Sequence, residues 1–383
     1  MQCNALRIWA GFAGEDSSHF WEWRLKLDIG SLLSRKNPPM AGIDISTSGV
    51  RLVELSRSDK GELTLECYAS EPLPRGAIVD SNIDNIDQVA EAIRRVWRKS
   101  GTNAQAVVLG MPSASVITRK VVLSASLTED EMERQVEAEA SQYIPFALDE
   151  VSLDFDVVGP AASSPDDVEV VLAAARKEKV EDRVAVAEAA GLKPMVMDIE
   201  SHAARAAIGR ILDQTPKAEQ GRIIALFQIG AHTANFSVLV DQQPVYEREQ
   251  PFGGNQLTQD IIRAYGLSYE EAEQKKRANE LPDGYERDIL APFLESVAQE
   301  VTRAIQFFFT SSPHTHVDHI YLAGGCAILP GLADVVANRT RVKASVVSTF
   351  KGMRLSNKIR EKQLQIEEPG YLVACGLAMR RFD

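Results

Sequence analysis

The stretch Gly42-Ile-Asp44-Ile-Ser46-Thr-Ser-Gly49-Val-Arg51 decides the fold, because it reads as a strand, a small polar turn and a second strand. The same order recurs in Leu226-Phe-Gln228-Ile-Gly230-Ala-His-Thr-Ala-Asn-Phe-Ser-Val238. Turns of this kind direct several backbone N–H groups at one point, where a phosphate group can bind. A third turn, Ala323-Gly-Gly-Cys326, follows later, so the sequence predicts a nucleotide held between two related halves. The first two copies differ where chemistry is expected, since Asp44 corresponds to Gln228.

The composition indicates an ordinary globular protein. The chain has 383 residues, enough for two domains or several subdomains, of which 45% are hydrophobic and 25% charged. Its formal net charge of −12 argues against nucleic acid as a partner. No stretch approaches the roughly 18 apolar residues that a spanning helix needs, so we expect membrane contact only through partners. The scattered cysteines Cys3, Cys67, Cys326 and Cys375 favour a reducing cytoplasm.

Residues 1–40 differ from the rest of the chain. They hold Trp9, Trp21 and Trp23 without a strong period and end in Lys36-Asn-Pro-Pro39, whose prolines break any helix before the first strand. We expect an irregular leader or a misassigned start codon. The alternative is an aromatic segment that caps the fold or enters a membrane interface.

Hydrophobic periodicity divides the remaining chain into repeating blocks. Residues 41–111 read as three strands, a helix and a further strand. Residues 116–192 read as strand, helix, two strands and helix, which is typical of a two-layer α+β module, and Thr128-Glu-Asp-Glu131 is a capping box for the first of these helices. The second half begins at Arg222 with the repeated strand–turn–strand pattern and includes a long amphipathic helix over 285–309. The shared skeleton indicates a duplication.

The three turns resemble the phosphate-1, phosphate-2 and adenosine motifs of the actin–Hsp70–sugar kinase superfamily. The insert resembles that of the FtsA-like branch, and residues 41–383 are similar to the PilM family of type IV pilus assembly proteins. The segments that carry this resemblance are Gly42-Ile-Asp-Ile-Ser46, Gln142-Tyr-Ile-Pro-Phe146, Phe252-Gly-Gly-Asn-Gln-Leu257, Tyr265-Gly-Leu-Ser268, Glu270-Glu-Ala-Glu273 and Gly370-Tyr-Leu-Val-Ala-Cys-Gly376-Leu-Ala. Gln-Tyr-Ile-Pro-Phe together with Phe-Gly-Gly is far more specific than a glycine turn alone.

The resemblance implies an α/β protein with an actin-like ATPase fold, built from duplicated ribonuclease-H-like halves and an FtsA-like α+β insert subdomain. The subdomains that it implies are 41–115 and 193–215 for subdomain 1A, 116–192 for insert subdomain 1C, 222–250 and 318–383 for subdomain 2A, and 251–317 for subdomain 2B. Residues 1–40 remain outside as the leader.

The resemblance also implies a site for ATP and Mg²⁺ formed by the three turns. Asp44 would hold Mg²⁺ through water, since Mg²⁺ keeps several waters and prefers carboxylate oxygens. Glu200 and Asp198, at the start of the helix that returns to the first half, would orient the attacking water. The other residues expected around the nucleotide are Ser46, Thr47, Ser48, Arg51, Gln228, Gly230, Ala231, His232, Thr233, Gly254, Asn255, Glu273, Lys276, Gly324, Gly325, Cys326 and Leu329.

Several of these residues have a structural alternative. Asp44 could be a turn residue, and Glu200 could cap its helix, because acids are favourable at helix N-termini. Glu273 and Lys276 could form an ordinary solvated pair on a helix. The segment His314-Thr-His316-Val-Asp-His319 looks like a metal cluster, but no Cys or Glu follows nearby, so we expect an ordinary loop.

Gln228 departs from the family pattern, which has Asp at this position of the second turn. A neutral amide can accept a hydrogen bond from a metal-bound water, but it lacks the negative charge that favours Mg²⁺. We therefore expect nucleotide binding with slow or absent hydrolysis.

The implied function is a cytoplasmic ATP-binding scaffold, peripheral to the inner membrane, that supports pilus biogenesis and twitching motility. The resemblance implies that the N-terminal cytoplasmic tail of the membrane protein PilN docks between subdomain 1A and the insert. Tyr143 and Phe146 are candidates for that groove, with packing inside the insert as their alternative role. Self-association and other pilus inner-membrane proteins are further expected partners. The alternatives are an FtsA-like division protein, an actin-like type II secretion protein, and a small-molecule kinase of the same superfamily.

Overall fold

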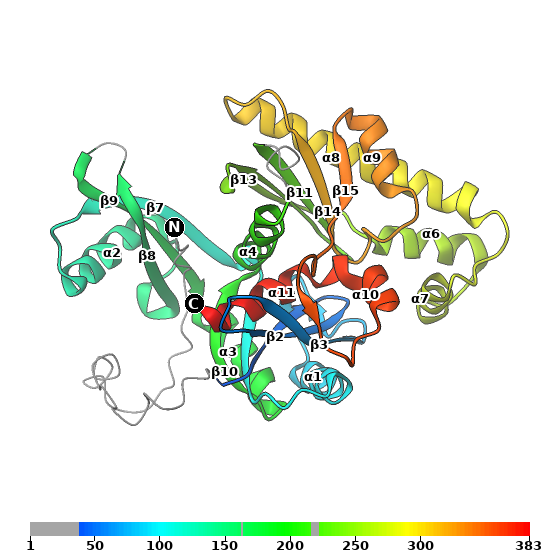
Figure 1. Cartoon of the computed structure of the whole chain (residues 1–383), viewed down its shortest axis with the longest axis horizontal. Coiled ribbons are helices and arrows are strands. Elements are labelled where there is room, and N and C mark those ends of the chain that lie inside the picture. The colour runs from blue at the N-terminus through cyan, green and yellow to red at the C-terminus, as the bar shows by residue number, and fades with distance from the viewer. Residues whose placement is uncertain (1–37, 162–163, 216–221) are drawn as a thin grey trace.

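The computed structural model describes residues 38–161, 164–215 and 222–383. Figure 1 shows two helix-covered β-sheets, one above the other, and a smaller sheet that projects to one side. The expectations for the leader before residue 38 fall outside the described residues. Within the described ranges, no helix is long and apolar enough to cross a bilayer.

The first sheet is built on the turn that opens the sequence. Its strands, in spatial order, are β10 (Lys193–Ile199), β6 (Ala106–Met111), β1 (Met40–Ser46), β2 (Gly49–Arg57), β3 (Leu63–Pro72) and β16 (Arg354–Leu355). The meander from β1 to β3 is antiparallel, whereas β6 runs parallel to β1 and β10 runs parallel to β6. The carboxyl ends of β1, β6 and β10 therefore meet at one edge of the sheet.

The second sheet repeats this order. Its strands are β13 (Gln243–Gln250), β12 (Ala234–Val240), β11 (Ile223–Ile229), β14 (His319–Ala323) and β15 (Lys343–Val346). β11 pairs antiparallel with β12 and parallel with β14, as β1 does with β2 and β6. The α/β fold is confirmed, and the shared strand order is the one that a duplication predicts.

Alternation along β1 sends its side chains to two different layers. Ile43 and Ile45 are fully buried in a core with α1 (Ile86–Ser100) and α3 (Lys177–Ala189). Gly42 lies on the opposite face, where a Cβ would lie 2.4 Å from the backbone nitrogen of Ala378 in α11 (Leu372–Met379). Since successive strand side chains point to opposite faces, Asp44 shares the face of Gly42.

Two helices fill the space between the sheets, as Figure 1 shows for α11 and α4 (Glu200–Asp213). On α4, Ala203 packs with Leu377 of α11 and with Val108 of the first sheet. Ile208 of the same helix packs with Leu226 of the second sheet. The approach is so close that a Cβ at Gly376 would lie 1.8 Å from the carbonyl oxygen of Ala203. The two halves therefore share one packed centre.

The C-terminal segment contacts the first half as well as the second. Phe350, Leu364 and Tyr371 form a cluster with Val53 and Leu65 of the first sheet, and β16 pairs with β3. α10 (Glu361–Glu367) supplies Leu364. The assignment of 318–383 to subdomain 2A stays a prediction, and a division of the chain has to allow for this crossing back to the first sheet.

The second sheet is covered by the helices α6 (Asn255–Tyr265), α7 (Tyr269–Ala278), α8 (Ala291–Ser311) and α9 (Leu332–Thr340). The helix predicted over 285–309 forms, but it opens with a π-helical stretch, Glu286–Leu290, before α8. Phe293 of α8 stacks on Phe252, with ring centroids 5.9 Å apart, which fixes the Phe-Gly-Gly segment against the helix.

The insert projects at the left of Figure 1 as a three-stranded sheet and one helix. Its elements are β7 (Val116–Ser124), α2 (Glu129–Tyr143), β8 (Val151–Ala161) and β9 (Ser164–Arg176), with β9 in the middle of the sheet. The capping box of Thr128 and Glu131 is present, and Met132 and Val136 pack on the sheet as expected. The second predicted helix, α3, packs instead in the core of the first sheet.

Candidate nucleotide site

The first turn is a compact hydroxyl-rich loop between β1 and β2. Ser46 Oγ donates to the Gly49 carbonyl at 2.9 Å and lies 3.4 Å from Ser48 Oγ. Arg51 Nη1 donates to Ser46 Oγ at 3.3 Å and lies 3.5 Å from Asp44 Oδ2. Arg51 therefore holds both the turn and its acid, which gives this residue a larger role than its sequence position indicates.

The second turn, between β11 and β12, closes on itself and contacts the first. Gly230 N donates to the Thr233 carbonyl at 2.9 Å. Thr47 Oγ1 and His232 Nδ1 lie 3.0 Å apart, so a hydrogen bond joins the two turns across the halves. Gln228 is half-buried on β11 and pairs in register with Asn235 and with Ala323, the residue that begins the third turn.

The third turn lies directly against the second. Cys326 N donates to the Ile229 carbonyl at 3.4 Å, and Gly254 N donates to the Gly230 carbonyl at 3.0 Å. A Cβ at Gly324 would lie 2.4 Å from the Ile229 carbonyl, and one at Gly254 would lie 2.4 Å from Cys326 Sγ. Only glycine permits this approach, which brings the backbones of the second turn, the third turn and the start of α6 together.

Arg51 also links the first turn to the third. A Cβ at Gly325 would lie 3.6 Å from Arg51 Nη2, and one at Gly370 would lie 3.5 Å from Arg51 Nε. The guanidinium thus lies over two glycines that leave the surrounding backbone uncovered. The Arg51 guanidinium lies above backbone without side chains and beside the Ser46 and Ser48 hydroxyls. Such an arrangement can bind the oxygens of a phosphate group.

A polar cluster on α6 and α7 borders the third turn. Glu273 forms an ion pair with Lys276 and accepts a hydrogen bond from Thr258, and Lys276 Nζ donates to Thr258 Oγ1 at 2.6 Å. Both charged side chains are only 20% exposed, so the pair is not an ordinary solvated one. Burial raises the pKa of the Cys326 thiol to about 11, while the nearby Lys276 opposes that shift, so the cluster faces the third turn.

Asn255 and Leu329, which were also expected at the site, lie beside the second and third turns. Asn255 N donates to the Ala231 carbonyl at 2.8 Å, which joins the start of α6 to the second turn. Leu329 packs at the edge of the second core, and its N–H donates to the Cys326 carbonyl at 3.2 Å. The site residues expected from the three turns and from α6 are therefore neighbours in the fold.

Asp44, which is buried, and Glu200, which is half-buried, form an acidic pair at the edge where β1 and β10 end. Asp44 is 6% exposed, and burial raises its pKa against the opposing charges of Arg51 and Arg183. Burial and the charge of Asp44 raise the pKa of Glu200 to about 8. Glu200 also abuts Gly110, whose added Cβ would lie 3.2 Å from Glu200 Cγ. This shift favours the protonated form of Glu200, which can donate a hydrogen bond.

Asp198 takes part in a different ion pair, and its expected role in orienting a water stays a prediction. Its Oδ2 lies 3.2 Å from Arg380 Nε, and its Oδ1 accepts from the Ile199 N–H at 2.8 Å. Both charged side chains are almost completely buried. Burial raises the pKa of Asp198 to about 6, and the charges that act on it come from Arg380, Arg205 and Asp383, none of which is in the three turns.

Arg183 of α3 is a site residue that the sequence interpretation missed. It is 2% exposed, and its positive charge acts on both Asp44 and Glu200. The sequence gives little signal for it, because an arginine beside the apolar residues Val180 and Val184 reads as a solvent-facing position of an amphipathic helix.

The histidine segment is an ordinary loop and strand, as expected. His319 Nε2 lies 2.7 Å from Ser345 Oγ, and His316 pairs with Asp318 at 3.6 Å. Among the described residues, no group of three His, Cys, Asp or Glu side chains is arranged to hold a metal ion. Mg²⁺ at Asp44 would therefore depend on waters and on phosphate oxygens of the nucleotide.

Comparison with known proteins gives one family and a set of similar folds. The family model described as the type IV pilus assembly protein PilM matches residues 42–382. A solved PilM–PilN type IV pilus biogenesis complex is 29% identical with a TM-score of 0.75, over 90% of this chain and 98% of that chain. The ethanolamine utilization protein EutJ from Carboxydothermus hydrogenoformans is 16% identical with a TM-score of 0.52, over 89% of each chain, which is a similarity of fold alone.

A more distant similarity is to MreB 5 of Spiroplasma citri, whose structure was solved with bound AMPPNP. It is 13% identical with a TM-score of 0.44, over 88% of this chain and 94% of that chain. At this level the similarity carries no argument about function.

Proposed function

The chain belongs to the family of the type IV pilus assembly protein PilM, and we propose that it is an assembly scaffold that binds PilN and holds a nucleotide between its two halves. The match to the PilM–PilN complex over nearly the full length of both chains is the observation that carries the proposal. The partner segment is the N-terminal cytoplasmic tail of PilN. Through it the protein would be peripheral to the inner membrane, and other pilus inner-membrane proteins and self-association are further candidates.

We place the PilN tail between subdomain 1A and the insert. A narrow pocket lies there, between the hairpin of β4 (Ile78–Val79) and β5 (Asn82–Ile83) and the start of α3. Its lining combines apolar and polar side chains: Ser81, Asn82, Ile83, Met111, Ser115, Lys179, Asp182 and Arg183. The space among these side chains is too small for a water molecule in this conformation, so docking of the tail would require the hairpin and α3 to separate.

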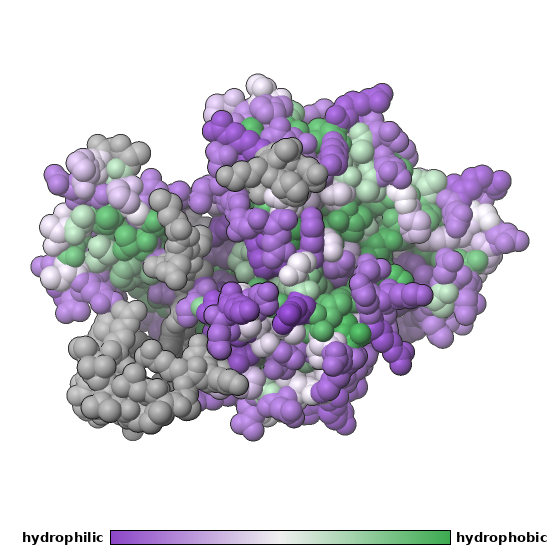
Figure 2. Space-filling model, viewed as in Figure 1, coloured by the Kyte–Doolittle hydropathy of each residue, from purple (hydrophilic) through white to green (hydrophobic). Residues whose placement is uncertain are grey.

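Exposed apolar side chains on the insert extend this surface. Tyr143 is 48% exposed and Phe146 is 39% exposed, and the Arg176 guanidinium lies 5.4 Å from the centroid of the Phe146 ring, just before α3 begins. Figure 2 shows hydrophobic residues reaching the surface of the insert. The structural alternative for these two residues, packing inside the insert, does not account for their exposure, which favours a role in docking.

The nucleotide proposal rests on the fit of the three turns to phosphates. Gly254 and Gly324 let the backbones of the second turn, the third turn and the start of α6 approach one another, and Arg51 supplies a positive charge beside the hydroxyls of the first turn. We propose ATP as the nucleotide, with Mg²⁺ held through water at Asp44 and with Glu273 and Lys276 at the ribose and base. Because Gln228 is neutral and lacks the charge that favours Mg²⁺, hydrolysis would be slow at most.

A titration of the full chain with the synthetic PilN N-terminal tail, measured by calorimetry with and without Mg-ATP, tests the proposal. We expect saturable binding with a different Kd in the two conditions, because a nucleotide that touches both halves changes the population of their arrangements. A scrambled tail is the control. No binding in either condition contradicts the scaffold proposal, whereas equal Kd values contradict only the nucleotide dependence.

A further inference from the structure

Arg183 is a buried cation that the insert brings to the first sheet. The side chain is 2% exposed, and it lines the pocket with Met111 and Ser115, which follow the end of β6. α3 contacts β10 and β5 in addition to β9. Arg183 therefore lies at the edge where the parallel strands end, which is where open α/β sheets bind ligands.

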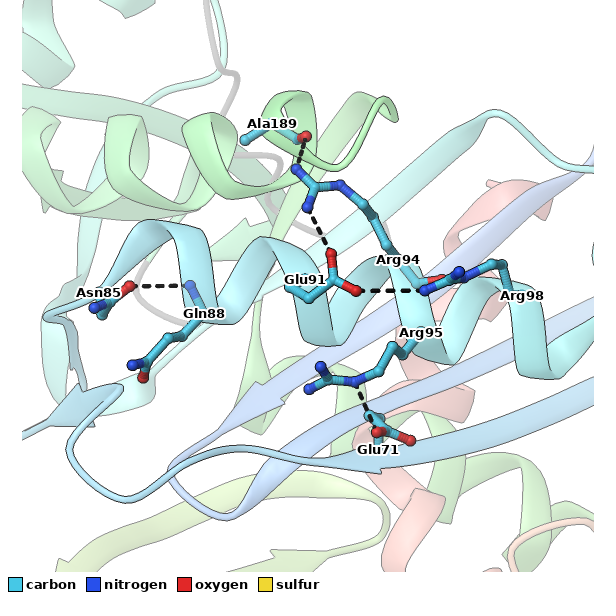
Figure 3. A network of polar contacts seen from close by, with 8 residues as sticks. All are labelled: Glu71, Asn85, Gln88, Glu91, Arg94, Arg95, Arg98 and Ala189. Carbon is cyan, nitrogen blue, oxygen red and sulfur yellow. Dashed lines mark hydrogen bonds and ion pairs between the residues drawn. The ribbon is translucent and has the colours of Figure 1, made fainter.

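The helix that carries Arg183 is firmly anchored at its other end. Figure 3 shows Arg94 of α1 reaching α3, where Arg94 Nη2 donates to the Ala189 carbonyl at 2.7 Å. Glu91 holds Arg94 through a 2.8 Å hydrogen bond and also pairs with Arg98. A cation on the last carbonyls of a helix satisfies groups that have no partner within the helix. The position of Arg183 thus follows from the packing of α3 on the first half.

The guanidinium of Arg183 is buried without the contacts that buried arginines normally make. Neither Nη1 nor Nη2 has a hydrogen-bond partner within the described part of the chain. Arg51 and Arg380, by contrast, lie 3.5 Å and 3.2 Å from the carboxylates of Asp44 and Asp198. Burial of unpaired N–H donors is costly, so a pair of them at a site edge indicates a ligand with acceptor oxygens.

The charges around Arg183 indicate where such a ligand would lie. Glu200, Asp44 and Asp182 act on its guanidinium, and their charges oppose the lowering of its pKa by burial. Asp44 and Glu200 are the acids of the candidate nucleotide site, so Arg183 faces that site from the insert side. Arg51 covers the opposite approach, over Gly325 and Gly370.

We propose that Arg183 binds the terminal phosphate group of the nucleotide, so that the insert itself contributes a ligand to the nucleotide site. The proposal rests on the proposed nucleotide binding. A planar guanidinium with two free donors matches two phosphate oxygens, and phosphate is the one part of a nucleotide that differs between ATP and ADP. The same helix lines the pocket assigned to the PilN tail, so the contact connects the two ligands through α3.

The test compares ATP and ADP binding to the full chain by fluorescence titration with labelled nucleotides. Arg183→Met removes the donors, and we expect its Kd for ATP to rise about tenfold or more, with a change of about twofold or less for ADP. Lys177→Met is the matched control, since Lys177 is a cation at the start of the same helix and is exposed to solvent. Its Kd values should equal those of the wild type.

The outcomes separate the inference from the function on which it rests. If the wild type binds neither nucleotide, the proposed nucleotide function fails. If the wild type binds ATP and Arg183→Met weakens ATP and ADP equally, or weakens neither, the inference is wrong and Arg183 only balances the buried acids. Should Arg183→Met not fold, Arg183→Lys keeps the charge but not the paired donors, and it is expected to show a smaller loss confined to ATP. An ATP affinity of Arg183→Lys equal to that of the wild type would overturn the inference.

Discussion

Thr47 Oγ1 and His232 Nδ1 lie 3.0 Å apart, although 185 positions separate the two residues in the sequence. Thr47 belongs to the first turn and His232 to the second, so the contact bridges the halves at the point where phosphate groups are expected. A nucleotide placed between the turns would have to separate these two side chains.

A double-mutant cycle with Thr47→Val and His232→Ala measures this contact. Without nucleotide we expect a coupling of about 0.5–1 kcal/mol in the free energy of unfolding, the usual worth of a hydrogen bond between neutral groups. With saturating Mg-ATP the coupling should vanish, because the phosphates lie between the turns. Chemical denaturation of the four proteins gives both values, and a coupling that nucleotide leaves intact would contradict this placement.

Gln228→Asp should increase the dependence of nucleotide binding on Mg²⁺. The added carboxylate supplies a negative charge at the second turn, where Gln228 provides only a neutral amide. We expect the Mg²⁺ concentration needed for half-maximal ATP binding to fall several-fold, and ATP turnover to rise. Gln228→Glu tests whether the shorter side chain is needed. Brisk turnover by the wild type, equal to that of Gln228→Asp, would sink the idea that Gln228 limits hydrolysis.

The raised pKa of Glu200 predicts a specific dependence of stability on pH. The folded pKa of about 8 lies above the unfolded value of about 4.3, so the native state binds the extra proton. Stability from this group is complete below about pH 4 and is lost as the pH rises toward 8, at no more than about 1.4 kcal/mol per pH unit. Glu200→Gln cannot ionise, so its stability relative to the wild type should increase over this range. Guanidinium denaturation at pH 5 and pH 8 measures it, with the exposed Glu178→Gln as control.

Asp198→Asn tests whether Asp198 has a role beyond its ion pair with Arg380. It removes the buried partner of Arg380, which keeps Asp383 as a second partner, so we expect a cost below the roughly 3 kcal/mol typical of breaking an isolated buried pair. We expect a lower Tm and an unchanged Kd for nucleotide, because Asp198 does not face the three turns. Replacing both residues, Asp198→Asn with Arg380→Met, should recover part of the loss. A specific loss of nucleotide affinity in Asp198→Asn would show that Asp198 acts in the site.

The contact between α11 and α4 predicts opposite effects for two glycines. Gly376→Ala would place a Cβ 1.8 Å from the Ala203 carbonyl, so we expect a loss of about 3 kcal/mol or more in the free energy of unfolding. Gly209→Ala, on α4 itself, meets only the end of the Gln242 side chain at 3.4 Å and should gain about 0.5–1 kcal/mol from helix propensity. Thermal unfolding of both variants checks the pair, and equal effects would show that the close approach is not limiting.

The repeated turns were readable from the sequence because their signal is local. Asp44 and Gln228 each follow a short apolar strand and precede small polar residues, so strand, turn and site position appear in one window. The capping box at Thr128 and Glu131 is equally local. Such features depend on neighbours in sequence, which is why the fold could be predicted and why the residues expected around the turns lie together, while their roles stay predictions.

The remaining features depend on partners far away in the chain. The ion pair of Asp198 gives no local signal, because its partner Arg380 lies near the other end of the sequence. Arg183 reads as a surface residue because its burial arises only when α3 docks on the first sheet. Hydrophobic periodicity in the sequence does not report such long-range docking. It also does not distinguish the π-helical stretch before α8 from an α-helix, because both keep the same apolar face.

The path of the insert has an evolutionary consequence. The chain leaves the first sheet after β6 and returns to it as β10, and these two strands are neighbours. An excursion between adjacent parallel strands can be exchanged for another without reordering the sheet. A different module inserted at this point could therefore bring a new binding specificity. Such a module would need a helix equivalent to α3 that covers the strand ends and carries an arginine at the position of Arg183.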